Sequence, residues 1–386
     1  MSATPPHFFL VAGEISGDLI GGRLMASLKK RLGPDVRFSG VGGPAMTAEG
    51  LESLFPMQEL SLMGLAEVLP HIPALLKRLS QTEAAVRAER PTALITIDAP
   101  SFTLRLAKSL GDAGIPRIHY VAPQVWAWRA GRAPKIARKI DRLLALFPFE
   151  PPWFTKHGLP TDYVGHPVVE GGALSGDGDR FRERYGIPAS KPLLTVLPGS
   201  RQGEVTRLLP VFAATVELLA EQVPGLQLVV PTVPQVADRV AEAIRSWPGD
   251  PLLVTDSVVK FDAFAASRAA LAASGTVALE LALAKLPAVI AYKVNPFTAW
   301  MLRRLLTIRY AALPNLILDE PLMPELLQED CNPAAIAKAL APLMLDTPVR
   351  GGMLEGYQRL ADAMELDLAP PSERAAEVIC RHVGLG

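Results

Sequence analysis

The stretch LPGSRQGEV, residues 197–205, is the point from which the organisation of the chain can be worked out. A short apolar run, 193–197, leads into it and predicts a buried strand, and a helical pattern over 208–222 follows it. A glycine turn between a strand and a helix directs free backbone N–H groups toward a phosphate. Arg201 lies in this turn, where its planar guanidinium suits a diphosphate. An ordinary strand-to-helix turn with a solvated arginine is the alternative.

A second glycine turn, Ser274-Gly275-Thr276, separates a predicted strand at 269–273 from a predicted helix at 277–284. This turn also places a helix N-terminus where a phosphate could bind. Glu280 lies one turn into the helix, where a carboxylate would repel phosphate but accept hydrogen bonds from a pair of sugar hydroxyls. A solvated helical glutamate is the ordinary alternative. Together the two turns favour a nucleotide-sugar site in the second half of the chain.

The first half of the chain begins with a similar strand, turn and helix. The apolar run 7–12 predicts a strand, and Gly13-Glu14-Ile15-Ser16-Gly17-Asp18 follows it directly. The glycines do not form the GxGxxG dinucleotide fingerprint. Glu14, Ser16 and Asp18 could face a substrate at this strand end, and Ser16 or Asp18 could equally be the helix N-cap.

A carboxylate also ends a later strand of the first half. Asp98 follows the apolar run 93–97 and directly precedes Ala99 and Pro100. Because open α/β sheets bind ligands beyond the carboxyl ends of their strands, Asp98 is expected at the rim of a ligand cleft. It is therefore a candidate general base, with a helix cap or turn former as the alternative.

Strand and helix patterns alternate through both halves, which predicts an α/β fold with parallel sheets covered by helices. The 386 residues are enough for two domains. We predict a first domain at 1–168, a linker rich in glycine and aspartate at 169–185, and a second domain at 186–345. The remaining helices, 346–386, are expected to pack back on the first domain or on a partner subunit.

Composition argues against several classes of protein. The 39 basic and 39 acidic residues balance to a net charge of +0, which argues against a general nucleic-acid binder. The two cysteines lie far apart and none of the six histidines has a partner at metal-ligand spacing, so we expect a reducing compartment and no bound metal. The N-terminus lacks the basic region of a signal peptide, and no apolar stretch reaches the roughly 18 residues of a membrane span. We expect a soluble protein or one that lies on a membrane surface.

Three stretches suit either internal packing or contact with lipid. In 60–79, apolar residues recur at near-helical spacing around two prolines, as in a core helix or in an apolar flap. Trp126 and Trp128 precede a basic run at 129–142, which suits a solvated face, an anionic lipid surface or a phosphorylated acceptor. The stretch 297–310 mixes aromatic residues with arginines and suits a membrane interface, a contact between domains or a subunit contact.

Nine short segments occur in an order that is more specific than any one of them. They are GEISGD (13–18), GVGGPAM (40–46), IDAP (97–100), HYVAPQVWAWR (119–129), FPFEPP (147–152), VGHP (164–167), LPGSRQGEV (197–205), SGTVALE (274–280) and LPNL (313–316). On these segments, which extend over almost the whole chain, the protein resembles the lipid-A-disaccharide synthase family. The resemblance implies an inverting glycosyltransferase of the B type (GT-B), with two Rossmann-like domains that face each other across a cleft. Its reaction joins UDP-2,3-diacylglucosamine to 2,3-diacylglucosamine 1-phosphate through a β-1,6 linkage and releases UDP, without a cofactor.

The resemblance also implies roles for individual residues. Asp98 would deprotonate the acceptor's 6-hydroxyl, with Glu14 as a second candidate base, whereas Ser101 replaces a second acid usual in the family and receives no role. The UDP site would comprise Gly199, Ser200, Arg201, Ser274, Gly275, Thr276, Glu280 and Asn315. The acceptor and the acyl chains would contact Gly17, Met63, Leu65, Val68, Leu69, Ile72, Trp126, Trp128, Arg129 and Arg132. Helix N-termini and Arg201, rather than a metal, would stabilise the departing diphosphate.

The same resemblance implies a location and an assembly. Both substrates carry acyl chains, so the protein is expected on the cytoplasmic face of the inner membrane of a Gram-negative bacterium, as a homodimer with exchanged C-terminal segments. Two other functions remain open at this point. A UDP-GlcNAc 2-epimerase-like enzyme would share the fold and the nucleotide subsite but would not need an apolar flap. A nucleotide-sugar-binding protein would bind the same ligands without turnover.

Overall fold

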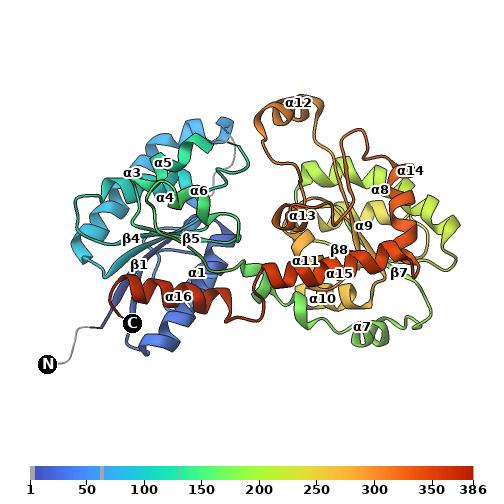
Figure 1. Ribbon diagram of the computed structural model, residues 1–386, viewed down its shortest axis with the longest axis horizontal. Helices are drawn as coiled ribbons and strands as arrows, with labels where there is room; N and C mark the ends of the chain where they lie inside the picture. Colours follow the sequence, from blue (N-terminus) through green and yellow to red (C-terminus); the bar gives the residue numbers. More distant parts are fainter. Residues whose placement is uncertain (1–4, 61–64, 129, 386) are drawn as a thin grey trace. The chain divides into compact units, whose positions relative to one another are not determined.

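The computed structural model describes residues 5–60, 65–128 and 130–385. The chain forms two compact units. Unit 1 comprises Met1–Pro167 and Leu368–Gly386, and unit 2 comprises Val168–Asp367. Figure 1 shows that each unit is layered, with helices on both faces of a sheet. The predicted α/β fold with two parallel sheets is confirmed.

Unit 1 is built on a six-stranded parallel sheet in the order β2-β1-β3-β4-β5-β6. The central strands are buried on both faces, as their nearly continuous apolar sequences require. The strand order reverses between β1 and β3, so the carboxyl ends of these two strands flank a topological switch point. The strands are β1 (His7–Ala12), β2 (Arg37–Val41), β3 (Ala93–Ile97), β4 (Arg117–Tyr120), β5 (Arg142–Ala145) and β6 (Thr161–Tyr163). The α-helices are α1 (Ile15–Leu32), α2 (Pro44–Ala48), α3 (Leu65–Glu89), α4 (Pro100–Ser109), α5 (Ala133–Ala137), α6 (Pro151–Thr155) and α16 (Pro371–His382).

Unit 2 repeats this plan with the order β12-β11-β10-β7-β8-β9. Here the order reverses between β7 and β10. The strands are β7 (Leu193–Leu197), β8 (Gln227–Pro231), β9 (Leu252–Val254), β10 (Ala269–Ala272), β11 (Ala288–Tyr292) and β12 (Glu325–Leu327). The α-helices are α7 (Gly178–Tyr185), α8 (Gln202–Gln222), α9 (Ala237–Ile244), α10 (Ser257–Ala266), α11 (Val277–Leu283), α12 (Pro296–Leu305), α13 (Leu313–Leu318), α14 (Pro333–Leu340) and α15 (Pro348–Ala363).

The C-terminal helices divide between the two units. The helix α15 belongs to unit 2 and packs on α11 and α13, whereas α16 belongs to unit 1 and packs on α1. Ser27 Oγ of α1 donates to Ser372 Oγ over 3.0 Å, and Arg374 Nη2 donates to the Tyr163 carbonyl over 3.0 Å. The segment expected as one group of helices, 346–386, is therefore two pieces, and the first of them completes unit 2.

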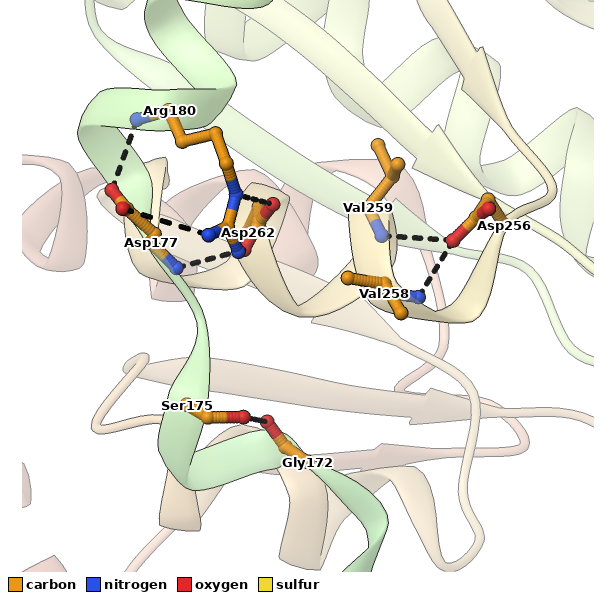
Figure 2. Close-up of polar contacts among 8 residues, drawn as sticks. All are labelled: Gly172, Ser175, Asp177, Arg180, Asp256, Val258, Val259 and Asp262. Carbon is orange, nitrogen blue, oxygen red and sulfur yellow. Dashed lines mark hydrogen bonds and ion pairs between the residues drawn. The ribbon is translucent and has the colours of Figure 1, made fainter.

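The segment 169–185, expected as a linker, is folded onto unit 2 (Figure 2). Asp177 accepts a hydrogen bond from the Arg180 backbone N–H and so caps α7. The buried carboxylate of Asp262, on α10, accepts from Asp177 N and from Arg180 Nε, each over 2.8 Å. A side chain at Gly176 would collide with the backbone of α10. Helix capping and close packing, rather than flexibility, therefore account for the aspartates and glycines here.

Three further findings concern membrane spans, metal sites and cysteines in the described residues. Within the described residues, no helix combines the length and the apolarity that crossing a bilayer requires. Over residues 5–60, 65–128 and 130–385, no three His, Cys, Asp or Glu side chains cluster in a way that could hold a metal ion. Cys331 and Cys380 are buried free thiols.

Candidate active site

In unit 2, a pocket of about 340 Å³ opens at the carboxyl ends of β7 and β10. These strands flank the point where the strand order reverses, which is where open α/β sheets bind ligands. Both predicted glycine turns line this pocket, one after each strand. Seven of the eight residues predicted to bind UDP are thereby brought together: Gly199, Ser200, Arg201, Ser274, Gly275, Thr276 and Glu280.

The turn after β7 depends on a glycine and on a buried carboxylate. Gly199 has a φ of 110°, which residues with a side chain rarely adopt, and a Cβ there would lie 2.9 Å from Glu204 Oε2. Glu204 accepts hydrogen bonds from Tyr292 Oη over 2.8 Å and from Ser200 N over 3.4 Å. The Arg201 side chain is exposed, and its Nη1 lies 3.8 Å from Glu204 Oε1. Glu204 therefore fixes the turn from within, while the Arg201 guanidinium remains accessible to an anionic ligand.

Lys260 of α10 also lines the pocket, although no sequence pattern indicated it. Its Nζ lies 2.8 Å from Glu280 Oε2, and both side chains are largely buried. The same ammonium lies 4.3 Å from the centroid of the Phe261 ring. Because the ammonium lies 2.8 Å from Glu280 Oε2, it neutralises the carboxylate and removes much of the repulsion that Glu280 would otherwise exert on an anion. Lys260 was missed because nothing local in the sequence links it to a residue twenty positions away.

The end of β8 and the loop that follows it supply a third wall, which no sequence pattern indicated. Pro231, Thr232 and Val233 line the pocket there. Thr232 Oγ1 is buried and has no hydrogen-bond partner in the described part of the chain. Because buried hydroxyls are normally paired, this one is a hydrogen-bonding group that a bound ligand can satisfy.

Asn315, the eighth predicted UDP residue, is 1% exposed and does not line the pocket. Its Nδ2 donates to the Met323 carbonyl and to Glu325 Oε1, each over 2.8 Å, and its Oδ1 accepts from Met323 N. Glu325 in turn accepts from the backbone N–H of Ala311, whose carbonyl accepts from Ser274 Oγ over 3.3 Å. Asn315 thus supports the loop that holds Ser274.

In unit 1, Asp98 lines a pocket of about 330 Å³ at the end of β3. Asp98 and Ala99 have φ angles of 51° and 45°, and Val121, on the loop after β4, has 79°. Non-glycine residues adopt this left-handed region at an energetic cost, and such strain is common at functional sites. Burial raises the pKa of the Asp98 carboxyl above its ordinary value. Two of the residues predicted to bind the acceptor, Trp128 and Arg132, line the same pocket.

Trp126 has a different position from Trp128. It is buried, with its ring edge-on to Phe147 and Phe149 at centroid distances of 6.3 and 5.1 Å. Its Nε1 donates to Glu150 Oε1 over 3.0 Å, and Glu150 Oε2 accepts from the backbone N–H groups of Leu146 and Phe147. Burial raises the pKa of Glu150 to about 7. Trp126 is therefore placed to hold the loop that precedes Trp128 rather than to line the pocket.

The turn after β1 separates its polar residues into different environments. Asp18 is buried, and its carboxylate accepts from the backbone N–H groups of Gly43, Ala45 and Met46 over 2.8 to 3.0 Å. It therefore caps α2 rather than facing a substrate. Glu14 is half-buried at the position preceding α1, at the carboxyl end of β1.

Gly17 lies one turn into α1, and a Cβ there would be 3.4 Å from both Ala12 Cβ and the Ile97 carbonyl. These are ordinary van der Waals distances, so Gly17 lies directly against the ends of β1 and β3.

The predicted apolar flap at 60–79 falls mostly on α3, which continues through both proline positions. Met63 lies outside the described residues, as does Arg129. Leu65, Val68 and Leu69 lie on the first turns of α3, and Ile72 and Leu76 further along it are exposed to solvent. An exposed apolar stripe is thus present on the part of α3 whose side chains the structure describes.

The fold is shared with a glycosyltransferase and with a UDP-GlcNAc 2-epimerase. The chain is similar to the Staphylococcus aureus MnaA–UDP co-structure (TM-score 0.63, 14% identity, 99% of this chain and 98% of that one). It is also similar to CalG4, the calicheamicin glycosyltransferase (0.65, 16%, 98% and 98%). The UDP-GlcNAc 2-epimerase from Neisseria meningitidis bound to UDP-GlcNAc gives 0.61 and 12%, over 98% and 99%. At these identities the likeness establishes the fold and does not separate a transferase from an epimerase.

Sequence similarity distinguishes the transferase from the epimerase. The family model for lipid-A-disaccharide synthetase matches residues 8–359. The lipid-A-disaccharide synthase of Rhodospirillum centenum is 55% identical over 377 residues, which span 97% of this chain and 94% of the relative. That of Paramagnetospirillum magneticum is 51% identical over 382 residues, which span 98% of each chain. The chain therefore belongs to the lipid-A-disaccharide synthase family and is a glycosyltransferase of lipid A biosynthesis.

Proposed function

We propose that unit 2 binds UDP-2,3-diacylglucosamine, that unit 1 binds 2,3-diacylglucosamine 1-phosphate (lipid X), and that Asp98 is the catalytic base. In the transfer, the acceptor O6 forms a bond to the donor C1 and the bond from C1 to the UDP oxygen breaks. Attack from the face opposite UDP inverts C1 and gives the β-1,6 linkage. The observation that carries this proposal is the pair of glycine turns that meet in one pocket at the ends of β7 and β10.

The donor half of the proposal rests on the charges around that pocket. Gly199 and Ser200, in the turn that precedes α8, bind the diphosphate together with the exposed Arg201 guanidinium. Glu280, neutralised by Lys260, accepts hydrogen bonds from the ribose hydroxyls. Negative charge increases on the diphosphate as the C1–O bond breaks, so Arg201 stabilises the transition state more than the ground state.

The acceptor half rests on the Asp98 pocket. The carboxylate takes the proton of the 6-hydroxyl as O6 attacks C1. A raised pKa makes this carboxylate a stronger base than an exposed aspartate. Arg132 lines the same pocket and supplies a cation for the acceptor's 1-phosphate.

The reaction can be tested with the purified full-length chain in detergent micelles. UDP release is measured with UDP-diacylglucosamine alone, with the 1-phosphate acceptor alone, and with both. Release only in the presence of both lipids, together with formation of a disaccharide 1-phosphate, is the expected result. Intact UDP binding without release in any mixture would show a binding protein, and conversion of UDP-GlcNAc to its 2-epimer would show an epimerase.

The location and the assembly are part of the same proposal. The enzyme associates peripherally with the cytoplasmic face of the inner membrane of a Gram-negative bacterium, where its acylated substrates reside. It forms a homodimer in which the C-terminal segment of each chain makes, with the partner chain, the contacts that α16 makes with α1. Light scattering after size exclusion should give twice the 41.4 kDa mass of the chain. A monomer at working concentration would contradict the exchange.

A further inference from the structure

The helix α12 is the most exposed apolar element of unit 2 among the described residues. In Figure 1 it stands at the tip of an excursion between β11 and α13, apart from the other labelled helices of its unit. Phe297 is 71% exposed and Trp300 is 52% exposed, and their rings are stacked with centroids 6.1 Å apart. Met301, Leu305 and Leu306 are also exposed, whereas Ala299 on the opposite side of the helix is buried. Core packing therefore does not account for these apolar residues.

A cluster of cations lies beside this apolar face. A cavity of about 420 Å³ is lined by Lys293, Trp300, Arg303, Arg304 and other residues of this region, including Glu329. The Arg304 guanidinium lies 4.0 Å from the centroid of the Trp300 ring, so one aromatic ring borders both the cations and the exposed apolar face. Glu329 pairs with Arg303 over 2.5 Å. The cavity walls thus carry three cations and one carboxylate, a net positive charge next to exposed aromatic rings.

Aromatic rings beside arginines match the chemistry of a bilayer interface. Tryptophan and phenylalanine partition into the headgroup region, and lysine and arginine near the surface are attracted to anionic lipids by about 1 kcal/mol each. The nucleotide pocket is lined by other residues, so this cavity belongs to a separate surface.

We propose that α12 docks on an anionic membrane. Phe297, Trp300 and Met301 insert among the headgroups, and Lys293, Arg303 and Arg304 bind a lipid phosphate in the adjoining cavity. This inference deepens the membrane association proposed above, because it names the residues in unit 2 that make the contact and the lipid charge that they require. The docking does not depend on turnover, so it can be tested separately from the reaction.

The test uses the full-length chain and vesicles of phosphatidylcholine, with or without phosphatidylglycerol. We expect the chain to co-sediment more strongly with the anionic vesicles. The variant Phe297→Ser/Trp300→Ser should lose binding at least about tenfold, because it removes the inserted rings. The variant Lys293→Gln/Arg304→Gln should lose the preference for anionic vesicles. The matched control Leu345→Ser/Val349→Ser changes two exposed apolar residues of unit 2 outside α12 and should bind as the unchanged chain does.

Tryptophan fluorescence supplies a second measurement. Vesicles with brominated acyl chains should quench part of the emission, and Trp300→Phe should abolish that part. Equal binding of neutral and anionic vesicles would overturn the inference. Unchanged vesicle binding by the Phe297→Ser/Trp300→Ser and Lys293→Gln/Arg304→Gln variants would also overturn it. If the unchanged chain self-associates and these variants are monomers, the surface is a contact between proteins, which would overturn the inference as well.

UDP release in detergent micelles tests the reaction separately from membrane docking. In detergent micelles, where no bilayer is present, the α12 variants should release UDP at the rate of the unchanged chain. Absence of release from every form would contradict the proposed function while leaving the vesicle results to stand. A reduced rate for the α12 variants alone would overturn the separation of this surface from the active site.

Discussion

Asp98 combines burial with a left-handed backbone in a pocket that also contains Arg132. The replacement Asp98→Asn keeps the shape of the side chain and removes its basicity. We expect it to lower kcat by at least about 100-fold, the usual contribution of a general base, and to leave the Kd for UDP nearly unchanged. Steady-state UDP release and calorimetric UDP binding measure the two quantities. In the unchanged enzyme, kcat/KM should fall as the pH is lowered, at a pH above the ordinary aspartate range, because burial raises the pKa of Asp98.

Glu14 is the matched control for this prediction, since it also follows a central strand of unit 1 and is half-buried. Glu14→Gln should retain a measurable acid limb in the pH profile, whereas Asp98→Asn should lose it. Near-normal turnover by Asp98→Asn would make Asp98 a structural residue and Glu14 the candidate base.

Glu150 gives unit 1 a pH-dependent stability. Its pKa is raised from 4.5 to about 7 in the folded chain by burial, so the folded state holds the proton more tightly than the unfolded state. This contribution to stability is fully present below about pH 4.5 and is lost as the pH rises through about 7, and the difference corresponds to about 3 kcal/mol. We expect the unfolding free energy of unit 1 to fall between pH 5 and pH 8, and Glu150→Gln to flatten that fall.

Urea unfolding followed by tryptophan fluorescence measures this effect in a background with Trp247→Phe and Trp300→Phe, which removes the tryptophans of unit 2. Other titrating groups affect both forms alike, so the difference between the two curves isolates Glu150. Parallel curves would assign the pH dependence to other groups.

Among the elements, the turn between β7 and α8 has the strictest requirement for one residue. Gly199→Ala combines an unfavourable φ of 110° with a contact of 2.9 Å to the Glu204 carboxylate. We expect a loss of UDP affinity of at least about tenfold and a destabilisation of about 1–3 kcal/mol, because backbone strain alone costs that much. Isothermal calorimetry and thermal unfolding measure the two effects.

Gly186→Ala is the control, since Gly186 also has a positive φ, of 63°, but would meet no atom within 4 Å. It should destabilise the chain modestly and leave UDP binding unchanged. Equal losses of UDP affinity in the two variants would show that the Glu204 contact does not shape the site.

The bounds of individual strands and helices show how much of the fold could be predicted from the sequence. The strand predicted at 193–197 coincides with β7, because an unbroken apolar run fits a strand covered on both faces. The helix predicted from 208 begins at Gln202, since the glycine turn ends directly at the helix N-terminus. The helix α10 begins at Ser257, where Asp256 accepts hydrogen bonds from Val258 N and Val259 N. Local patterns thus located the strand β7 and the start of α11, whereas the starts of α8 and α10 depend on a turn and on capping contacts.

The candidate site also has parts that local sequence patterns predict and parts that they do not. Glycine turns after strands are local features, and they located the walls of the nucleotide pocket. The Lys260–Glu280 pair and the Tyr292–Glu204 hydrogen bond join residues that are distant in the sequence, and no periodicity reveals them. The burial of Trp126 was missed because its partner, Glu150, is a carboxylate that sequence alone would place at the surface.

At the scale of the whole molecule, unit 1 includes the distant segment Leu368–Gly386, which contains α16. Deletion of Leu368–Gly386 would uncover the face of α1 that packs on α16 and leave Ser27 without its hydrogen-bond partner. We expect unit 1 to lose its cooperative unfolding transition, whereas unit 2 should still bind UDP, because all the residues that line its pocket lie within Val168–Asp367. Hydrogen exchange resolved by peptide, together with UDP calorimetry, tests both parts.

A protected unit 1 in the truncated chain would show that α16 is dispensable. Deletion of Met1–Pro5, which precedes β1, is the matched control and should leave both units protected.

The division of unit 1 into two chain segments affects how the protein is made. The chain leaves unit 1 after Pro167 and returns to it at Leu368, so a ribosome releases all of unit 2 before it delivers the helix that finishes unit 1. The usual order of synthesis, in which an N-terminal domain folds first, is thereby reversed. Until Leu368–Gly386 has been synthesised, the face of α1 that packs on α16 is uncovered, and chaperones can bind there. A prematurely terminated product would keep that face permanently, which marks it for proteolysis.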